Sequence, residues 1–380
     1  MLFNQGNYLQ IDTNRCLNRQ HYSVECKHCV SNCPGQALVL SNRRIYFIPE
    51  NCLGCGLCFA DCPTQVFGSK QWDETTIVSV IQERGFLVTR FFCGNHSTPY
   101  LNKDEKGKGA IQVPTCLSSI SKGAWYDIGL ITSVELLLDE CEQCSMKDCI
   151  KRLNINIETA LEWLISSGHT PEFSYIDYID NVEKTKRKKN YQATATGLKV
   201  TSRRDLFLSL IGKVNESVRG INSPEDTVDD KKKMNLLPDW QKRLEESFQN
   251  NYKEGGFPAF WPSIEISEDC VVCGTCVNYC PTQALKIEVQ ENVCTYSFIS
   301  GHCLDCRICM LCCPTQSITR DRNRNETPFI PQDIHKVSIG ECRQCGAYTR
   351  LDELRLCFWC EKEPPEEELI LDVRKKLFKM

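Results

Sequence analysis

Short runs of apolar residues near the two ends of the chain predict pairs of β-strands. In the N-terminal part the runs cover residues 37–40 and 45–48, and in the C-terminal part they cover residues 284–289 and 295–299. Polar or turn-forming residues bound each run, which is typical of strands rather than of buried helices. The order strand, loop, short helix and strand is therefore predicted in both parts.

The stretch between these parts has a different pattern, in which strands alternate with helices. Strands are predicted at residues 86–92, 110–113 and 134–138, and helices at residues 76–82 and 157–164. Alternation of this kind predicts a small α/β domain.

The chain then turns polar over residues 171–258, which predicts a linker with amphipathic helices. A capping box at residues 202–205 precedes the apolar residues 206–211 and predicts one helix. A second polar helix is predicted at residues 239–249. The basic run at residues 184–189 is expected to be solvated, with docking of an acidic partner as the alternative.

Cysteine content adds more to this picture than any other feature of composition. The chain has 27 cysteines among 380 residues, an odd number that disulfides cannot fully pair. Most lie two or three residues from the next, and such close neighbours rarely bridge each other. Thiols repeated at short spacing in a chain of this length predict metal ligands in a reducing compartment.

The cysteines near both ends follow the spacing C-x2-C-x2-C-x3-C, followed by proline. Three of the four copies are complete, whereas in the first copy nine residues separate the first cysteine from the second. In chain order the copies are Cys16, Cys26, Cys29 and Cys33; Cys52, Cys55, Cys58 and Cys62; Cys270, Cys273, Cys276 and Cys280; and Cys303, Cys306, Cys309 and Cys313.

This spacing has a mechanical reason. Three cysteines two residues apart wrap one corner of an iron–sulfur cubane, and the cysteine before proline reaches the other cluster of the pair. Four [4Fe–4S] clusters are therefore predicted. Their ligand sets are Cys16, Cys26, Cys29 and Cys62; Cys33, Cys52, Cys55 and Cys58; Cys270, Cys273, Cys276 and Cys313; and Cys280, Cys303, Cys306 and Cys309.

Two further features of these motifs carry expectations. Gly54, Gly56 and Gly274 are expected to let backbone N–H groups approach the sulfurs. Cys294 and Cys312 fit no set, and Cys294 is expected to be a small buried residue. Zinc knuckles are the alternative interpretation, although zinc gives no reason for a proline-marked fourth cysteine.

With these motifs, both ends of the chain resemble bacterial dicluster ferredoxins. The resemblance covers about 60 residues at each end of the chain. It implies a ferredoxin-like βαββαβ fold for each module, two [4Fe–4S] clusters in each, and transfer of single electrons.

Five more cysteines follow the predicted strands of the middle domain. They are Cys93, Cys116, Cys141, Cys144 and Cys149. Because ligands bind beyond the carboxyl ends of strands in such domains, the five are predicted to converge and to hold a further iron–sulfur cluster, [2Fe–2S] or [4Fe–4S]. A redox-active thiol pair and structural cysteines are the alternatives. His96 is expected to be a polar surface residue rather than a ligand.

The middle stretch is similar to the small iron–sulfur subunit of hydrogenases linked to heterodisulfide reductase, and to ferredoxin-like proteins that accompany molybdenum formate dehydrogenases. The shared elements are Cys93, the residues 114–117 (Pro-Thr-Cys-Leu) and the run 136–149. The spacing C-x4-C of the hydrogenase subunit matches Cys144 and Cys149. That family has extra cysteines after its first strand, where this chain has Gly-Asn-His.

Two C-x2-C knuckles, separated by 11 residues, follow the second module. Their members are Cys342, Cys345, Cys357 and Cys360. This spacing predicts a zinc-ribbon-like site with one structural zinc ion, and a rubredoxin-type iron site is the alternative.

Together these features predict an α+β chain of several parts. The expected parts are a dicluster ferredoxin module (1–75), a small α/β cysteine-bearing domain (76–170), a polar linker (171–258), a second dicluster module (259–325), a zinc-ribbon-like knuckle (335–364) and a tail (365–380).

The net charge and the motifs that the sequence lacks argue against several classes of function. A net charge of −4 argues against binding of nucleic acid. With neither a signal peptide nor an apolar run of about 18 residues, a cytoplasmic protein without a membrane span is expected. The chain has no flavin, dinucleotide or P-loop fingerprint.

An electron-transfer subunit is therefore predicted rather than a self-contained catalyst. Its partner is expected to be another redox protein, such as a molybdenum- or flavin-containing oxidoreductase. The alternatives are an enzyme that uses the middle cysteines for thiol–disulfide chemistry, and a zinc-binding structural or regulatory protein.

Overall fold

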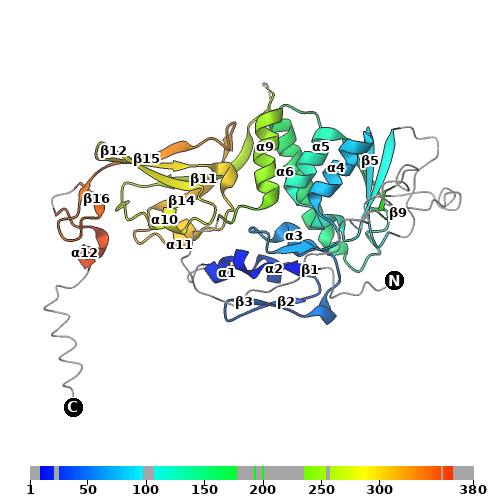
Figure 1. The fold of residues 1–380 in the computed structure, drawn as a ribbon, viewed down its shortest axis with the longest axis horizontal. Helices are drawn as coiled ribbons and strands as arrows, with labels where there is room; N and C mark the ends of the chain where they lie inside the picture. Colours follow the sequence, from blue (N-terminus) through cyan, green and yellow to red (C-terminus); the bar gives the residue numbers. More distant parts are fainter. Residues whose placement is uncertain are drawn as a thin grey trace, which may run out of the picture. The chain divides into compact units, whose positions relative to one another are not determined.

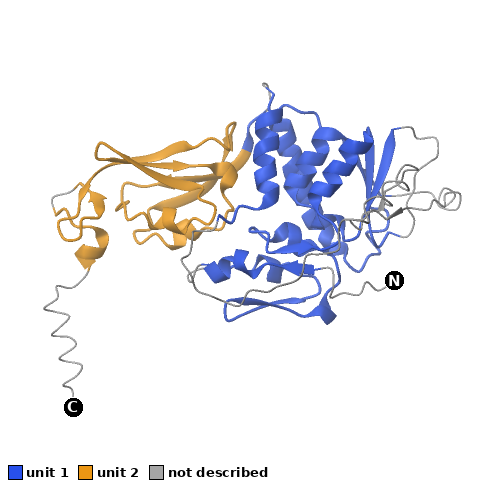
Figure 2. Ribbon diagram, viewed as in Figure 1, with its two compact units in different colours: residues 1–259 blue, residues 260–380 orange. Residues whose placement is uncertain are grey.

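The computed structural model describes most of the chain, in two compact units, Met1–Ala259 and Phe260–Met380 (Figure 2). The helix predicted at residues 206–211, the basic run 184–189 and the tail 365–380 lie outside the described residues. The described residues are 9–20, 25–96, 107–177, 192–193, 199–200, 235–253, 257–351 and 354–362.

Four short strands form two antiparallel pairs in the N-terminal part of unit 1 (Figure 1). β1 (Leu9–Ile11) pairs with β4 (Phe67–Ser69), and β2 (Leu38–Ser41) pairs with β3 (Arg44–Phe47). The turn from β2 to β3 is tight because Asn42 and Arg43 adopt positive φ angles of 48° and 63°, which suit a hairpin. Both strands predicted from the apolar runs are confirmed.

Short helical segments carry the cysteines between these strands. They are η1 (Thr13–Arg15), α1 (Leu17–Gln20), α2 (His28–Ser31), η2 (Pro49–Asn51) and α3 (Leu57–Asp61).

A six-stranded sheet with the order β8-β7-β5-β6-β10-β9 forms the middle of unit 1. Its first four strands are parallel, and β10 and β9 run antiparallel to their neighbours. The predicted middle strands are confirmed. The strands are β5 (Val88–Cys93), β6 (Lys108–Val113), β7 (Ser133–Leu137), β8 (Phe173–Ile176), β9 (Gln192–Ala193) and β10 (Lys199–Val200).

Helices α4 (Glu74–Arg84), α5 (Lys122–Ile131) and α6 (Ile150–Ser166) pack with this sheet. The 3₁₀ turns η3 (Leu117–Ser119) and η4 (Lys147–Cys149) precede α5 and α6.

The core between the helices and the sheet is aromatic. Phe91 of β5 is fully buried, and its ring meets Trp125 of α5 edge-on at 5.2 Å between centroids. Trp125 also meets Phe173 of β8 at 6.3 Å, so one side chain joins helix α5 to two strands.

A further helix, α9 (Asp239–Asn251), lies beside α5 and α6 (Figure 1). The sequence predicts this helix but assigns it to a polar linker, whereas it packs within unit 1. Leu244 and Phe248 are buried, and Trp240 stacks on Trp163 of α6 at 6.5 Å. Its polar residues face solvent along the other side, which explains the polar composition.

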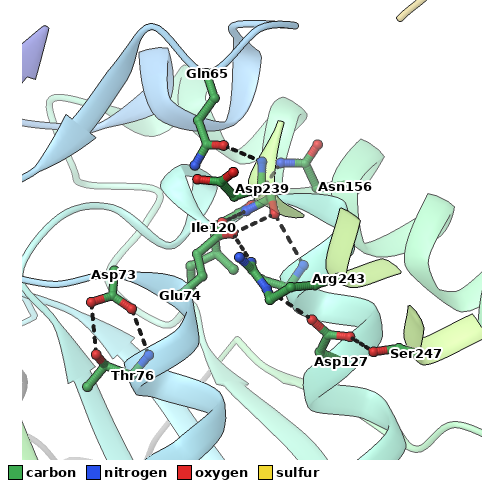
Figure 3. A network of polar contacts seen from close by, with 12 residues as sticks. Gln65, Asp73, Glu74, Thr76, Ile120, Asp127, Asn156, Asp239, Arg243 and Ser247 are labelled. Atoms are coloured by element: carbon green, nitrogen blue, oxygen red, sulfur yellow. Dashed lines mark hydrogen bonds and ion pairs between the residues drawn. The ribbon is translucent and has the colours of Figure 1, made fainter. Parts of the chain in front are cut away.

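Charged side chains fix the register of α9 (Figure 3). Arg243 contacts Glu74 of α4 at 2.8 Å and Asp127 of α5 at 3.6 Å. Glu74 also accepts hydrogen bonds from the backbone N–H and hydroxyl of Ser121, at 2.6 and 2.9 Å, and so caps the start of α5. Ser247 donates to Asp127 at 2.8 Å. One partly buried arginine therefore ties three helices together.

In unit 2, β11 (Ala259–Ile266) pairs with β14 (Ile318–Asn325), and four antiparallel strands follow the order β12-β13-β15-β16. The strands predicted at residues 284–289 and 295–299 are confirmed, and Cys294 is fully buried as expected. The remaining elements are α10 (Thr275–Tyr279), β12 (Leu285–Gln290), β13 (Val293–Phe298), η6 (Ser300–His302), α11 (Ile308–Leu311), β15 (Gln332–Glu341), β16 (Tyr348–Arg350) and α12 (Phe358–Lys362).

The mixture of helices and strands agrees with the predicted α+β class. Among the residues that the structure describes, no helix has both the length and the apolar character needed to cross a membrane.

Replacing Leu244 with alanine tests the packing of α9. Leu244 is fully buried, so Leu244→Ala is expected to lower the free energy of unfolding by about 2–5 kcal/mol. The matched control is Leu87→Ala, at a side chain that is 73% exposed, where a change within about 0.5 kcal/mol is expected. Anaerobic guanidinium denaturation followed by far-UV circular dichroism measures both, and equal losses would contradict the packing described.

Candidate iron–sulfur and metal centres

The structure gathers the cysteines of the two ends into four groups of four. In the first group, Cys62 lies with three cysteines from the preceding motif. Three of these groups each line a cavity. The first cavity is lined by Cys16, Cys26, Cys29 and Cys62. The second is lined by Cys33, Cys52, Cys55 and Cys58, together with Cys29, and the third is lined by Cys270, Cys273, Cys276 and Cys313. The fourth group is Cys280, Cys303, Cys306 and Cys309, whose sulfurs lie within electrostatic reach of one another.

A repeated turn follows the fourth cysteine of each motif. After each Cys-Pro pair, the glutamine two residues beyond the proline adopts a left-handed conformation. These residues are Gln36, Gln65, Gln283 and Gln316, with φ between 52° and 57°. The turn directs backbone N–H groups toward the preceding sulfur, because Ala37 donates to Cys33 Sγ and Val66 donates to Cys62 Sγ, both at 3.3 Å.

Several of these thiol groups are costly to ionise, because burial raises their pKa. Burial, together with the neighbouring sulfurs of Cys62 and Cys26, raises the pKa of Cys29 to about 12. Burial likewise raises the pKa of Cys303 to about 12 and that of Cys306 to about 11. Thiolates gathered in this way need a compensating positive charge, which an iron–sulfur cluster supplies. The donor sets and the enclosed cavities therefore fit cubane clusters.

Cys312 lies next to the third group without lining its cavity. Its thiol donates to the carbonyl oxygen of Cys309 at 3.5 Å, whereas Cys313 lines the cavity. This arrangement agrees with the proline-marked register, in which Cys313 is the ligand.

The middle cysteines converge at the carboxyl ends of three strands. Cys93 ends β5, Cys116 follows β6, and Cys141 and Cys144 follow β7. These four side chains line one cavity with Leu117 and Leu138. The parallel strands β5, β6 and β7 place their ends at the same edge of the sheet, which explains the convergence.

Cys149 is the middle cysteine that does not line this cavity. It ends η4, is 1% exposed, and contacts Cys55 and Cys116. Hydrogen bonding from Cys149 lowers the pKa of Cys55 and lowers that of Cys116 to about 6, and it raises the pKa of Cys149 itself. Cys144 lines the cavity and Cys149 does not, and the spacing C-x4-C in the sequence could not distinguish the two.

His96 is buried rather than on the surface, contrary to the expectation from sequence. It is 7% exposed, its Nε2 lies 2.9 Å from Oδ1 of Asp139, and its backbone N–H donates to the carbonyl of Cys93. Asp139 lies two residues before Cys141, so the pair joins the loops that present Cys93 and Cys141. Sequence reasoning missed Asp139, because the two residues come from different strands.

The four C-terminal cysteines form a tighter group than those at the cavities. All four sulfurs of Cys342, Cys345, Cys357 and Cys360 lie within 4.8 Å of one another, and Sγ of Cys345 lies 3.7 Å from Sγ of Cys357. A tetrahedral zinc site with Zn–S bonds of about 2.3 Å has sulfurs about 3.8 Å apart. Hydrogen bonds from backbone N–H groups, chiefly that of Cys357, lower the pKa of Cys342 to about 6, which favours the thiolate that a metal needs. The group fits one tetrahedral ion.

Comparison with protein families agrees with these centres at both ends. A model of the 4Fe-4S dicluster domain matches residues 24–66, and a model of the 4Fe-4S binding domain matches residues 264–286. The chain therefore contains two ferredoxin-type domains, and this class of domain carries out iron–sulfur electron transfer. Neither match reaches the middle cysteines or the C-terminal group. Comparison with curated proteins found no match.

Gly56 is required by a close approach between the second cysteine group and the middle domain. Its φ is 72°, and a Cβ there would lie 2.8 Å from Cβ of Ser119. Gly274 holds the same position in unit 2, with φ 68°, and a Cβ there would make only ordinary van der Waals contacts, at 3.8 Å with Ile287 and 3.9 Å with Asn278. Arg307 in the last motif has φ 60°, so a side chain is tolerated at this position where nothing opposes it.

The two glycines give a matched pair of variants. Gly274→Ala is expected to destabilise the chain by about 1–2 kcal/mol, the cost of a left-handed residue with a Cβ. Gly56→Ala is expected to cost at least about 1 kcal/mol more, because the methyl group also meets Ser119. Thermal unfolding under anaerobic conditions compares them, and equal shifts in melting temperature would argue against the close approach.

Proposed function

We propose that the chain is an electron-transfer protein that holds four [4Fe–4S] clusters in two ferredoxin-type modules. The observation that carries this proposal is the gathering of the cysteines into four groups, with the proline-marked cysteine exchanged between neighbours. When bound, such clusters take up and release single electrons over a wide range of potentials. The chain's own residues bind the iron and donate hydrogen bonds to the ligand sulfurs.

We also propose a further iron–sulfur cluster in the middle domain, held by Cys93, Cys116, Cys141 and Cys144. An apolar cavity lined by cysteines from several loops supports this assignment. We propose as well that the middle domain is related to the small subunit of hydrogenases linked to heterodisulfide reductase and to proteins that accompany formate dehydrogenases. Substrate chemistry is then the task of a partner, such as a molybdenum- or flavin-containing oxidoreductase.

Iron counting on anaerobically prepared protein tests the four-cluster proposal. About 16 iron atoms per chain are expected from four cubanes, with an additional amount from the middle domain. Cys276→Ala is expected to remove about four of them and one spin from the electron paramagnetic resonance (EPR) spectrum of the reduced protein.

The matched control is Cys294→Ala, at a fully buried cysteine of the same unit that lies outside every group. It is expected to leave the iron content unchanged, and far-UV circular dichroism checks that both variants fold. A colourless wild-type protein that contains only zinc would overturn the proposal.

Thiol chemistry in the middle domain is the second candidate. The lowered pKa of Cys116, about 6, is the observation that favours it, because the thiolate is the reactive form. Alkylation of the iron-loaded protein separates the two functions. Protection of Cys116 by bound iron supports the cluster, and rapid alkylation of Cys116 in iron-replete protein supports the thiol enzyme.

For the C-terminal group we propose one structural zinc ion. Cys345→Ser is expected to remove one zinc per chain and leave the iron content unchanged, because the four thiolates together form a closed site. Elemental analysis by mass spectrometry measures both metals. Loss of one iron instead of zinc would assign a rubredoxin-type site.

A further inference from the structure

The first cysteine group takes its cysteines from two segments of the chain, and Arg15 joins these segments. Cys16 and Cys62 line the same cavity, and so does Thr64. Nε of Arg15, the residue directly before Cys16, donates to the carbonyl oxygen of Thr64 at 2.7 Å. Thr64 comes two residues after Cys62. One side chain therefore links the two segments that supply cysteines to the first group.

Another nitrogen of the same guanidinium group holds a third segment, which leads into α9. Nη2 of Arg15 donates to the carbonyl oxygens of Leu237 at 3.0 Å and Leu236 at 3.3 Å. Both leucines are buried. The backbone N–H of Asp239, the first residue of α9, donates to Oε1 of Gln65 at 2.7 Å (Figure 3). The first N–H groups of a helix have no acceptor within the helix, so Gln65 satisfies one of them. The start of α9 is thus fastened to the turn that contains Gln65.

α9 is held from its other side as well. Its Arg243 contacts Glu74 of α4 at 2.8 Å and Asp127 of α5 at 3.6 Å (Figure 3). Because these ion pairs anchor α9 to the middle domain, the segment before α9 is fixed at both ends. The carbonyl oxygens that Arg15 contacts are therefore held in place.

This setting makes the charge of Arg15 effective at the first group. Its three acceptors are neutral carbonyl oxygens, so these bonds fix the guanidinium group without cancelling its charge. Arg15 is half-buried, and a partly buried charge is screened less than an exposed one. In unit 2 an acidic residue, Asp269, stands directly before the first cysteine of the motif. The arginine is therefore a feature of the first module alone.

We propose that Arg15 is a positioning residue of the first cluster site, which clamps the segments of Cys16 and Cys62 and holds a fixed positive charge beside the cluster. The inference deepens the proposed function and rests on it, because it assigns both cysteines as ligands of one [4Fe–4S] cluster. A positive charge stabilises the more negative reduced state and so raises the reduction potential of the cluster. The segment before α9 belongs to the site, because it supplies two of the three acceptors.

Redox titration of the anaerobically prepared full chain, followed by EPR, tests this role. Arg15→Gln is expected to keep the iron content and to move the potential of one cluster to a more negative value. Arg15→Lys is expected to restore most of this shift, because the charge returns although the planar set of donors is lost. The affected cluster is identified by the signal that is missing in Cys26→Ala.

The matched control is Arg19→Gln. It removes the same charge from an exposed side chain four residues further on, which donates to Thr13 at 2.7 Å. Water and salt screen this charge, so a much smaller shift is expected. Equal shifts in Arg19→Gln and Arg15→Gln would attribute the effect to net charge and contradict the inference.

The remaining outcomes also decide. An unshifted potential in iron-replete Arg15→Gln would overturn the inference. If Arg15→Gln loses the iron of one cluster, retention of that iron by Arg15→Lys supports the role, whereas loss from both variants would make Arg15 a folding residue and overturn it. Wild-type iron content judges the proposed function separately. Absence of the first cluster from the wild-type protein contradicts the four-cluster proposal, whereas an unshifted potential with all clusters present contradicts only the role of Arg15.

Discussion

The structure depends on one electrostatic constraint, which is that burial makes several of the clustered thiols costly to ionise by themselves. Burial and neighbouring sulfurs raise the pKa of Cys29 to about 12 and that of Cys141 to about 12. At neutral pH these groups are protonated, and binding of iron must release their protons. Stability of the cysteine loops and loading with iron are therefore linked, since metal binding favours the folded arrangement of ligands.

The middle domain contacts the first module through the loops that carry Cys55 and Cys116. The hydrogen bond from Cys116 to Cys55 and the ion pair of Arg152 with Asp61 both lie within a few residues of assigned ligands. A domain that only needed a tether could attach anywhere on the module. Attachment at the cysteines keeps the second cysteine group adjacent to the middle cysteines.

Local patterns predicted the parts of this structure that depend on local causes. The strands beside the motifs followed from apolar runs, and the grouping of the cysteines followed from spacing and proline. The burial of His96 and the packing of α9 did not, because their partners are distant in sequence: Asp139 for His96, and Glu74 and Asp127 for Arg243. Strand β8 was missed because it lies at the start of the polar stretch and has no buried residue.

Two kinds of cysteine site can be distinguished by the space between their sulfurs. Three of the four module groups and the middle group line cavities that are also lined by apolar side chains, as a multi-atom cluster needs. The C-terminal sulfurs all lie within 4.8 Å of one another, which leaves room for a single ion at their centre. Spacing in the sequence alone separates these cases poorly, because C-x2-C pairs occur in both. The decisive difference is that the cysteine before a proline joins a neighbouring group, as Cys62 and Cys313 do, instead of closing a tetrahedron.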